Sequence, residues 1–191
     1  MEIEIKLDAS EVSEESVFAL FGITEVKEKT MSAVYYDDAE GTLEKNGIAL
    51  RLRRENGEGI VTLKRRMHNA EGFSRRGEWE CPADDIASGL AGIDTEDEGT
   101  NGIVRSAAQR GLVPIAQMDF TRKYAALKLD GSEIELAFDR GLFNRRTPFC
   151  ETELELKSGT EEVLTSAAER LEGELGMKPQ PLSKLARALR E

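Results

Sequence analysis

The feature that most constrains the fold is a period-2 alternation of charged and apolar residues that recurs along most of the chain. In residues 2–7, two glutamates and a lysine alternate with Ile3, Ile5 and Leu7. Side chains of a β-strand point alternately to its two faces, so this pattern predicts a strand with one apolar and one charged face. Eight segments show such alternation: 2–7, 33–37, 48–53, 60–65, 73–81, 119–129, 133–139 and 150–157.

Four other stretches are predicted to be helical, because each combines a capping residue or a terminating glycine with helix-forming composition. The acidic, glycine-rich segment 84–101 predicts instead a connector with at most a short helix. The predicted helices run from Asp8 or Ser10 to near Gly22, from about Asn101 to Arg110, from Thr160 to Gly176, and from Ser183 to the end of the chain.

The order of these elements predicts the fold class. Strands follow one another with few helices and without regular βαβ alternation, which favours an α+β, mainly β, antiparallel architecture. Eight antiparallel strands can close into a barrel whose interior holds one small ligand. At 191 residues, a single domain over residues 1–191 is the default. We therefore expect one domain with an antiparallel α+β or barrel architecture.

Composition narrows the class of function. The net charge of −11 repels nucleic acid and anionic membranes, so neither is expected as a partner. No apolar run could cross a bilayer, and the start MEIEIKL has no signal-peptide character, so we expect a cytoplasmic protein. Cys81 and Cys150 form no CxxC pair, so neither a zinc site nor a disulfide is expected. The one histidine, His68, is expected at the surface, which argues against a histidine-based mechanism.

The charged faces of the predicted strands carry the chemistry. One such strand alone is typical of a sheet with one face in solvent. Here, however, neutral polar residues are scarce, and Glu151, Glu153 and Glu155 recur on one side of one strand, where they repel each other unless a cation lies opposite. We therefore expect the charged faces to share a cavity. Its acids are Glu2, Glu4, Glu78, Glu80, Glu135, Asp139, Glu151, Glu153 and Glu155, and its cations are Lys6, Arg51, Arg53, Lys64, Arg76 and Arg122.

This mixture of residue types suits phosphoryl transfer. A carboxylate cluster without histidine or cysteine favours Mg²⁺ or Mn²⁺, and arginine offers a planar fork of donors to phosphate oxygens. Phosphoryl transfer depends mostly on positioning and electrostatic stabilisation, so it needs no nucleophilic triad. The chain has no GxxxxGK[ST] loop, which excludes a P-loop enzyme.

The sequence Glu2-x-Glu4-x-Lys6 resembles the ExExK signature of the CYTH family, also called triphosphate tunnel metalloenzymes. The ending LSKLARAL (182–189) is similar to the end of the catalytic domain in bacterial inorganic triphosphatases of this family. The resemblance covers essentially the whole chain, because further motifs follow in the family's order. They are YYDD (35–38), LRLR (50–53), TLK (62–64), RGEWE (76–80), FTRKY (120–124), ELAFDRG (135–141) and ETELELKSG (151–159).

The resemblance implies an α+β, mainly β, fold: a closed eight-stranded antiparallel β-barrel with helices packed outside, over core residues such as Trp79 and Phe138. It also implies that a triphosphate binds in the barrel lumen, and it implies residue roles. Glu135, Glu78 and Glu80 are expected to balance neighbouring cations. Lys184 lies in a C-terminal helix that in this family can close one tunnel mouth, and it is either a phosphate contact or a surface lysine. The implied metal ligands are Glu2, Glu4, Asp139, Glu151, Glu153 and Glu155; the catalytic residues are Glu2, Glu4, Lys6, Glu151 and Glu153; the substrate-binding residues are Lys6, Arg51, Arg53, Lys64, Arg76, Arg122 and Lys184.

The leading expectation for function is divalent-metal-dependent hydrolysis of inorganic triphosphate to pyrophosphate and phosphate. Class IV adenylyl cyclase, which makes cyclic AMP from ATP, and thiamine triphosphatase are alternatives within the same fold. A non-catalytic binder of polyphosphate or nucleotides is the alternative from another class, although anion binding alone needs no row of glutamates. The sequence leaves open whether the protein is a monomer or a homodimer, and whether a helical phosphate-binding domain (CHAD) follows.

Overall fold

The computed structural model describes the backbone of residues 2–66 and 74–190, and the side chains of residues 3–65 and 77–190. His68 and the side chains of Glu2 and Arg76 lie outside these ranges. Cys81 and Cys150 are both free, as expected. No helix among the described residues is both long enough and apolar enough to span a membrane.

Nine strands and six helices form within the described residues. The strands are β1 (Glu2–Asp8), β2 (Lys27–Asp37), β3 (Ile48–Glu55), β4 (Glu58–Arg66), β5 (Ser74–Pro82), β6 (Val113–Leu129), β7 (Ser132–Phe143), β8 (Thr147–Ser158) and β9 (Lys178–Pro179). The helices are α1 (Glu14–Leu20), α2 (Thr42–Lys45), α3 (Ile86–Ala91), α4 (Glu98–Arg110), α5 (Glu161–Leu175) and α6 (Lys184–Ala188).

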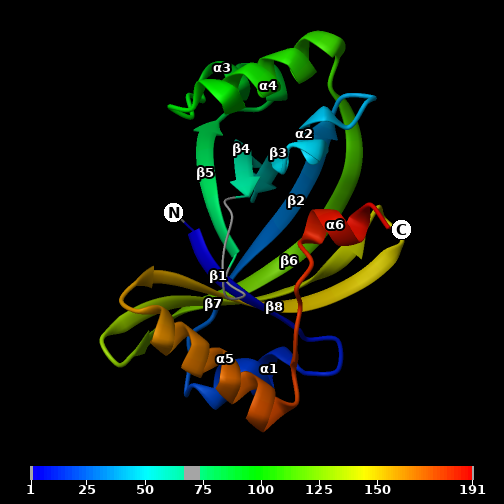
Figure 1. Cartoon of the computed structure of the whole chain (residues 1–191). Coiled ribbons are helices and arrows are strands. Elements are labelled where there is room, and N and C mark those ends of the chain that lie inside the picture. Colours follow the sequence, from blue (N-terminus) through cyan, green and yellow to red (C-terminus); the bar gives the residue numbers. More distant parts are fainter. Residues whose placement is uncertain (1, 67–73, 191) are drawn as a thin grey trace.

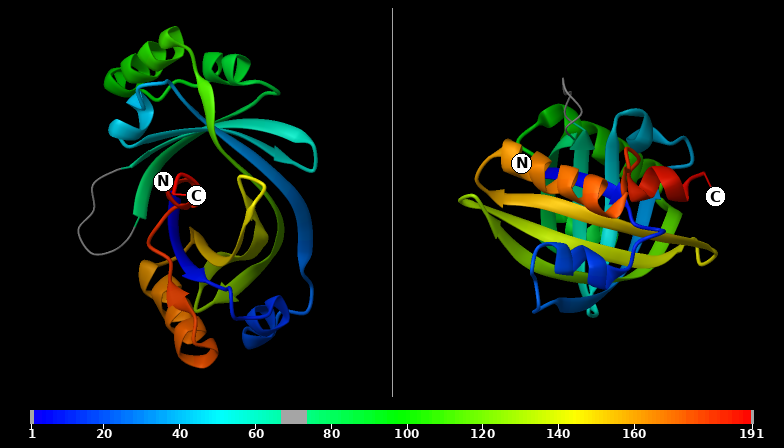
Figure 2. Two further views of the ribbon diagram at one scale, coloured as in Figure 1. Left: turned by 90° about the vertical axis from the view of Figure 1, so that its right-hand side faces the viewer. Right: turned by 90° about the horizontal axis from the view of Figure 1, so that it is seen from below.

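The strands form one antiparallel sheet in the order β5-β4-β3-β2-β6-β7-β8-β1-β9. β1 also pairs with β5, through Glu2 opposite Arg76, Ile3 opposite Arg75 and Glu4 opposite Ser74. Figure 2 shows how strongly the strands curve. The expected α+β, mainly β, antiparallel class is therefore confirmed.

Helices cover the outer, apolar face of the sheet from two sides (Figure 1). On one side, α1 and α5 pack over β1, β6, β7 and β8, where Phe138 is 1% exposed and shares a cluster with Leu164 and Leu171 of α5. On the other side, α2, α3 and α4 cover β3 and β4, and Trp79 packs against this second cluster. Both aromatic residues thus pack under outer helices, as the sequence predicted.

The inner face of the sheet is partly apolar, and α6 packs on it. Met31 and Phe120 from the sheet form a third cluster with Phe149, Leu185 and Ala188, of which the last two belong to α6. α6 therefore lies on the inner face, unlike α1 and α5.

The ends of two helices differ from the sequence predictions. The first helix begins at Glu14 with Ser13 as its N-cap, and not at Asp8 or Ser10. Asp8 instead continues β1, where it pairs with residues of β8 and β9. The last helix ends at Ala188 and does not run to the end of the described chain.

The segment predicted as a connector contains α3 and the first turn of α4, which Asp97 caps. In the sequence, the glycines of this segment indicate a low helix propensity. In the structure, Gly89 instead has a packing role within a helix. A Cβ atom on Gly89 of α3 would lie 2.3 Å from the Val61 side chain of β4. Glycine thus allows α3 to approach the sheet closely.

α2 and β9 were not predicted. α2 has no side-chain cap at the adjacent position, because its N-cap is Gly41 in the left-handed region. The N–H groups at the start of α2 donate instead to a residue further upstream in the sequence. The Asp37 carboxylate accepts hydrogen bonds from Leu43 N at 2.9 Å and from Glu44 N at 3.0 Å. Asp38 accepts one from Arg110 Nε at 2.7 Å, which ties α4 to this corner. A cap four to seven residues upstream lies outside the local pattern that predicts a helix start.

Two leucines of β7 offer a test of the packing. Leu136 is 0% exposed in the cluster under α1 and α5, whereas Leu142 is 39% exposed. Leu136→Ala is expected to lower the free energy of unfolding by about 2–5 kcal/mol, because it leaves a cavity in the core. Leu142→Ala, the same change on the same strand, is expected to alter it by less than about 0.5 kcal/mol. Urea denaturation at pH 7 measures both, and equal losses would contradict this packing.

Candidate functional site

The inner face of the sheet borders a cavity of about 680 Å³ with a charged lining. Among the residues whose side chains are described, eight cations and seven glutamates line it, so cations are in slight excess although the whole chain carries a net charge of −11. The cations are Lys6, Lys29, Arg51, Arg53, Lys64, Arg122, Lys157 and Lys184; the glutamates are Glu4, Glu55, Glu78, Glu80, Glu135, Glu153 and Glu155.

Strand register brings acids from different strands side by side. Glu155 of β8 lies opposite Glu4 of β1 on one side and Glu135 of β7 on the other. Glu151 of β8 likewise lies opposite Asp139 of β7. Like charges directly opposite one another destabilise a sheet unless cations compensate them. The arrangement therefore depends on the cations that reach the same face.

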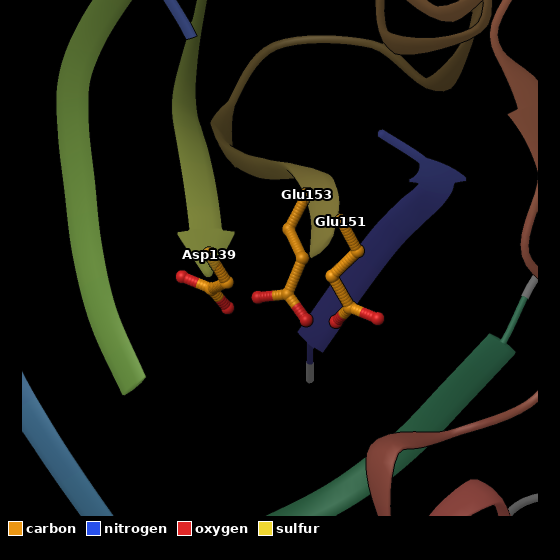
Figure 3. Close-up of side chains that lie close together, drawn as sticks. All are labelled: Asp139, Glu151 and Glu153. Atoms are coloured by element: carbon orange, nitrogen blue, oxygen red, sulfur yellow. The ribbon is translucent and has the colours of Figure 1, made fainter. Parts of the chain in front are cut away.

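Asp139, Glu151 and Glu153 form the most compact acidic cluster among the described residues, called here the carboxylate triad. One carboxylate oxygen from each lies within 4.8 Å of the others, and Figure 3 shows the three carboxylates gathered from β7 and β8. Asp139 and Glu151 are both 0% exposed. Buried carboxylates are stable as ions only when paired and hydrogen-bonded.

Three cations meet the triad. The Lys184 ammonium lies 2.8 Å from Asp139 Oδ2 and 2.8 Å from Glu153 Oε1, and it also contacts Glu151 Oε1. Arg122 donates two hydrogen bonds of 2.7 Å to the two oxygens of Asp139 and contacts Glu153. Such a bidentate pair fixes orientation as well as charge.

The third cation, Arg187, contacts Glu151 Oε2, so cations of α6 engage both oxygens of this carboxylate. The Arg187 guanidinium also lies over the rings of Phe143 and Phe149, at 5.0 and 5.7 Å from their centroids. Ala188 of the same helix accepts a hydrogen bond of 2.7 Å from Asn144 Nδ2 through its carbonyl oxygen. α6 is therefore anchored independently of Lys184.

These contacts shift the protonation equilibria. Burial disfavours the charged form of Glu153, but Lys184 and then Arg122 hold its pKa well below the usual range. Burial likewise acts to lower the pKa of Lys184, yet Asp139 and Glu153 outweigh it, so this pKa is raised. The pKa of Arg122 is raised well above its usual value because Glu153 and Asp139 outweigh its burial. Glu153, Lys184 and Arg122 are therefore all charged at neutral pH.

The opposite wall of the cavity, on β3, β4 and β5, carries the remaining arginines. Lys64 lies 3.1 Å from Glu78, and Arg53 lies 3.1 Å from Glu80. Arg51 lies 3.8 Å from Glu78, and its buried Nε has no hydrogen-bond partner among the described residues. A buried donor without a partner is costly unless a ligand satisfies it. The wall thus contains a buried donor without a hydrogen-bond partner among the described residues.

Most of the residues singled out from the sequence converge on this cavity. Glu78 and Glu80 pair with neighbouring cations as expected, and Glu135 lies 3.9 Å from Arg122. Lys184 is not a surface residue, since its side chain is only 10% exposed. Nine line the cavity directly: Glu4, Lys6, Arg51, Arg53, Lys64, Arg122, Glu153, Glu155 and Lys184.

Four further sequence-derived site residues are not among these nine. Asp139 and Glu151 belong to the triad and are fully buried. Glu2 and Arg76 pair through their backbones between β1 and β5, and their side chains lie outside the described ones. Glu4 and Glu155 line the cavity without joining the triad. The structure thus divides the expected metal ligands into a compact cluster and outlying acids.

Sequence reasoning missed Lys29, Glu55, Lys157 and Arg187. Lys29 lies 3.1 Å from Glu55 across β2 and β3, but β2 is apolar on the same face at Met31, which hid the charged alternation. Lys157 continues the glutamate row of β8 with the opposite charge. Arg187 follows Lys184 by three residues, which puts both side chains on one face of the predicted helix. This spacing was the sequence signal that could have identified Arg187 as a site residue.

The carboxylate triad fits a divalent cation. Its three side chains offer only oxygen donors, which hard cations such as Mg²⁺ prefer. The cluster already attracts a cation, since the Lys184 ammonium contacts all three carboxylates. Next to it, a water-accessible cavity carries an excess of cations. The arrangement can therefore hold a metal ion beside a polyanion.

Residues 1–189 match the CYTH domain family, and the chain belongs to this family. An inorganic triphosphatase of Haemophilus influenzae is 30% identical over 187 residues, an alignment that covers 89% of this chain and 49% of that protein. The chain therefore spans about half the length of this curated relative.

Solved structures share the fold over nearly the whole chain. A protein from Hippeastrum, described as a proposed adenylyl cyclase with a dominant triphosphatase activity, has a TM-score of 0.74 at 22% identity, covering 100% of this chain and 95% of its own. A proposed adenylate cyclase from Bacillus halodurans has a TM-score of 0.63 at 18% identity, covering 98% and 96%. At these identities the likeness concerns the fold.

The triad predicts how stability depends on pH. The pKa of Glu153 is lower in the folded protein than the usual value of about 4.3, so its ionisation stabilises the fold above that pH and the contribution is lost as the pH falls. Glu153→Gln should lower the free energy of unfolding by about 3 kcal/mol at pH 7, because Lys184 and Arg122 each lose one buried carboxylate partner. The difference from wild type should shrink between about pH 4 and pH 2.

Guanidinium chloride denaturation over this pH range measures the difference between the two proteins. Glu169→Gln, a change at an exposed glutamate of α5, is the control and should show no such trend. A deficit of Glu153→Gln that stayed constant down to pH 2 would contradict the depressed pKa.

Proposed function

We propose that this protein hydrolyses inorganic triphosphate to pyrophosphate and phosphate with Mg²⁺ or Mn²⁺. The observation that carries the proposal is a cavity lined by eight cations next to a carboxylate triad, two members of which are fully buried. The 30% identity to an inorganic triphosphatase supports it. A non-catalytic anion binder would not require a triad of buried carboxylates, whose burial is unfavourable without compensation.

We further propose that β5, β4, β3, β2, β6, β7, β8 and β1 close into a tunnel, within one domain that spans residues 1–191. The pairing of β1 with β5 supports closure, because it links the two ends of this strand order. A tunnel admits a linear anion along its axis while its walls supply donors from all sides. We also propose a cytoplasmic protein, and the strong negative charge of the chain supports the absence of nucleic-acid or membrane partners.

The cations of the cavity would bind the phosphate chain. Lys6, Arg51, Arg53 and Lys64 line the cavity from β1, β3 and β4, and Arg51 has an unused buried Nε donor. Arg122 and Lys184 line it from the side of the triad, and Arg76 of β5 is the last member of the set. Donors fixed in advance around the anion stabilise the charge that moves during phosphoryl transfer.

The acids would hold the metal and orient water. Asp139, Glu151 and Glu153 would form the main site, with Glu2, Glu4 and Glu155 as further ligands. When bound, a divalent cation supplies charge neutralisation and polarises the phosphate oxygens. Glu151 and Glu153 would accept hydrogen bonds from the attacking water and so position it.

An apolar wall would strengthen these interactions. Met31, Met118 and Phe120 line the same cavity, between its charged sides. Their side chains solvate no ions and lower the effective dielectric constant, which increases the attraction between the cations and a bound polyanion. The phosphate chain would consequently lie along the charged strands and away from β2.

A second cavity favours an organic triphosphate as the alternative substrate. It measures about 690 Å³, shares Glu135 and Lys157 with the first, and includes Val26 and Tyr124 in its lining. An organic group attached to a terminal phosphate could extend into it. This observation, and the descriptions of both related structures, make adenylyl cyclase activity on ATP the second candidate.

Neighbouring arginines of β3 test the role of the cavity. Arg53 points into it, whereas Arg54 points outward and lies 3.0 Å from Asp84. Arg53→Ala is expected to lower kcat/KM for inorganic triphosphate by at least about 100-fold, since it removes a preorganised donor. Glu4→Gln should cause a loss of similar size. Arg54→Ala removes the same side chain from the outer face and should retain activity within a few-fold. Full activity of both Arg53→Ala and Glu4→Gln would overturn the proposal.

The substrate is tested by product analysis. Purified protein is incubated with inorganic triphosphate, ATP or thiamine triphosphate in Mg²⁺ or Mn²⁺, and phosphate, pyrophosphate and cyclic AMP are quantified. We expect phosphate and pyrophosphate from inorganic triphosphate at the highest kcat/KM. Cyclic AMP as the main product from ATP would favour the second candidate instead. The absence of any product would support a non-catalytic binder.

A further inference from the structure

The Lys184 ammonium occupies the position that a cation would take in the triad. The three carboxylates that can share a metal ion are Asp139, Glu151 and Glu153. The same three carboxylates contact Lys184 Nζ, at 2.8 Å for Asp139 and Glu153 and in a third, closer contact for Glu151. A metal ion and this ammonium therefore compete for the same three carboxylates.

Charge counting leads to the same conclusion. The triad carries three negative charges, and Arg122, Lys184 and Arg187 supply three positive charges in direct contact with it. Each carboxylate of the triad thus already has a cationic partner. A divalent cation that entered the triad would meet the repulsion of Lys184 at short range, in surroundings that screen charge poorly. Entry of the metal becomes favourable only after Lys184 leaves.

Of these three cations, Lys184 is the one whose departure from the triad leaves other anchors of its helix in place. It is the first residue of α6 and, with Ser183, lines the cavity. The helix itself stays anchored by Arg187 on Glu151 and by the Asn144 hydrogen bond to Ala188. The lysine side chain is a flexible four-carbon stem. The ammonium can therefore turn from the triad into the cavity while α6 remains in place.

We propose that Lys184 is an exchangeable counter-ion of the triad, which yields its place to a divalent cation when a triphosphate in the cavity attracts the ammonium. Because the anion in this statement is a triphosphate, the inference rests on the proposed function. It has a thermodynamic consequence: metal and triphosphate bind with positive coupling, and each increases the affinity for the other by the same factor. The species that the site takes is then the metal–triphosphate complex, and free metal ion binds poorly.

The decisive measurement is Mn²⁺ binding in the absence of any triphosphate, followed by electron paramagnetic resonance of the free ion. Lys184→Met removes the competing charge and keeps an apolar side chain of similar length. It is expected to bind Mn²⁺ at least about 10-fold more tightly than wild type, because the triad then holds uncompensated negative charge. A role for Lys184 only as a phosphate contact would leave the affinity for free Mn²⁺ unchanged.

A second arm measures the coupling. Addition of a non-hydrolysable imido analogue of triphosphate should tighten Mn²⁺ binding to wild type several-fold more than to Lys184→Met. Lys178→Met removes the same charge from an exposed position on β9 and should behave as wild type in both arms. Lys184→Arg keeps the charge and should bind free Mn²⁺ no more tightly than wild type.

The outcomes separate this inference from the proposed function. Circular dichroism confirms that each variant is folded, and Lys184→Gln provides an independent second removal of the charge. Free Mn²⁺ affinity in Lys184→Met and Lys184→Gln that equals or falls below that of wild type would overturn the counter-ion role, even in an active triphosphatase. Tighter Mn²⁺ binding by both variants would support it, even if hydrolysis of triphosphate by wild type were undetectable.

Discussion

The compensation of buried carboxylates by cations from distant parts of the chain is the interaction on which the rest of the structure depends. Asp139, Glu151 and Glu153 gather their charges within a few ångströms, with two of them fully buried. Without partners, such carboxylates would take up protons or open the structure. Arg122 from β6, with Lys184 and Arg187 from α6, neutralises them. The site is therefore held together by the same charges that make it suitable for metal and phosphate.

The curved sheet has its charged face on the inside and its main apolar face on the outside, which is the reverse of the usual arrangement. Its inner face is largely ionic, so the core of the protein lies outside it, in the apolar clusters under α1 and α5 and under α2, α3 and α4. Burial of these clusters stabilises the fold, and it does so without filling the cavity. The charged interior can then be adjusted for binding, because the apolar contacts that stabilise the strands are on the other face. α6 is the exception, since it joins the inner apolar wall to the triad.

Much of the fold and of the site could be predicted because both follow from local alternation. The eight longer strands, the charged faces and most cavity residues each depend on a side chain's position along one strand, and a period of two records that position directly. Residues whose placement depends on another segment were predicted less well. Lys29 escaped because Met31 interrupts the alternation beside it. α2 escaped because its capping acid, Asp37, lies outside the helix start.

By itself, the amino-acid sequence determined which chemical groups the site contains and on which face of the strands they lie. These groups are acids and cations that suit a metal ion and a polyanion, and they alternate with apolar residues along the strands. What only the tertiary structure decided is which charges meet. The triad arises from the register of β7 against β8, and the cations that contact it lie 17 to 45 positions away along the chain from their partners. Coulomb energy depends on distance in space and on local burial, and neither quantity is written in the spacing of residues along one strand. For this reason the sequence indicated Lys184 as a possible phosphate contact, while only the structure placed its ammonium among three carboxylates.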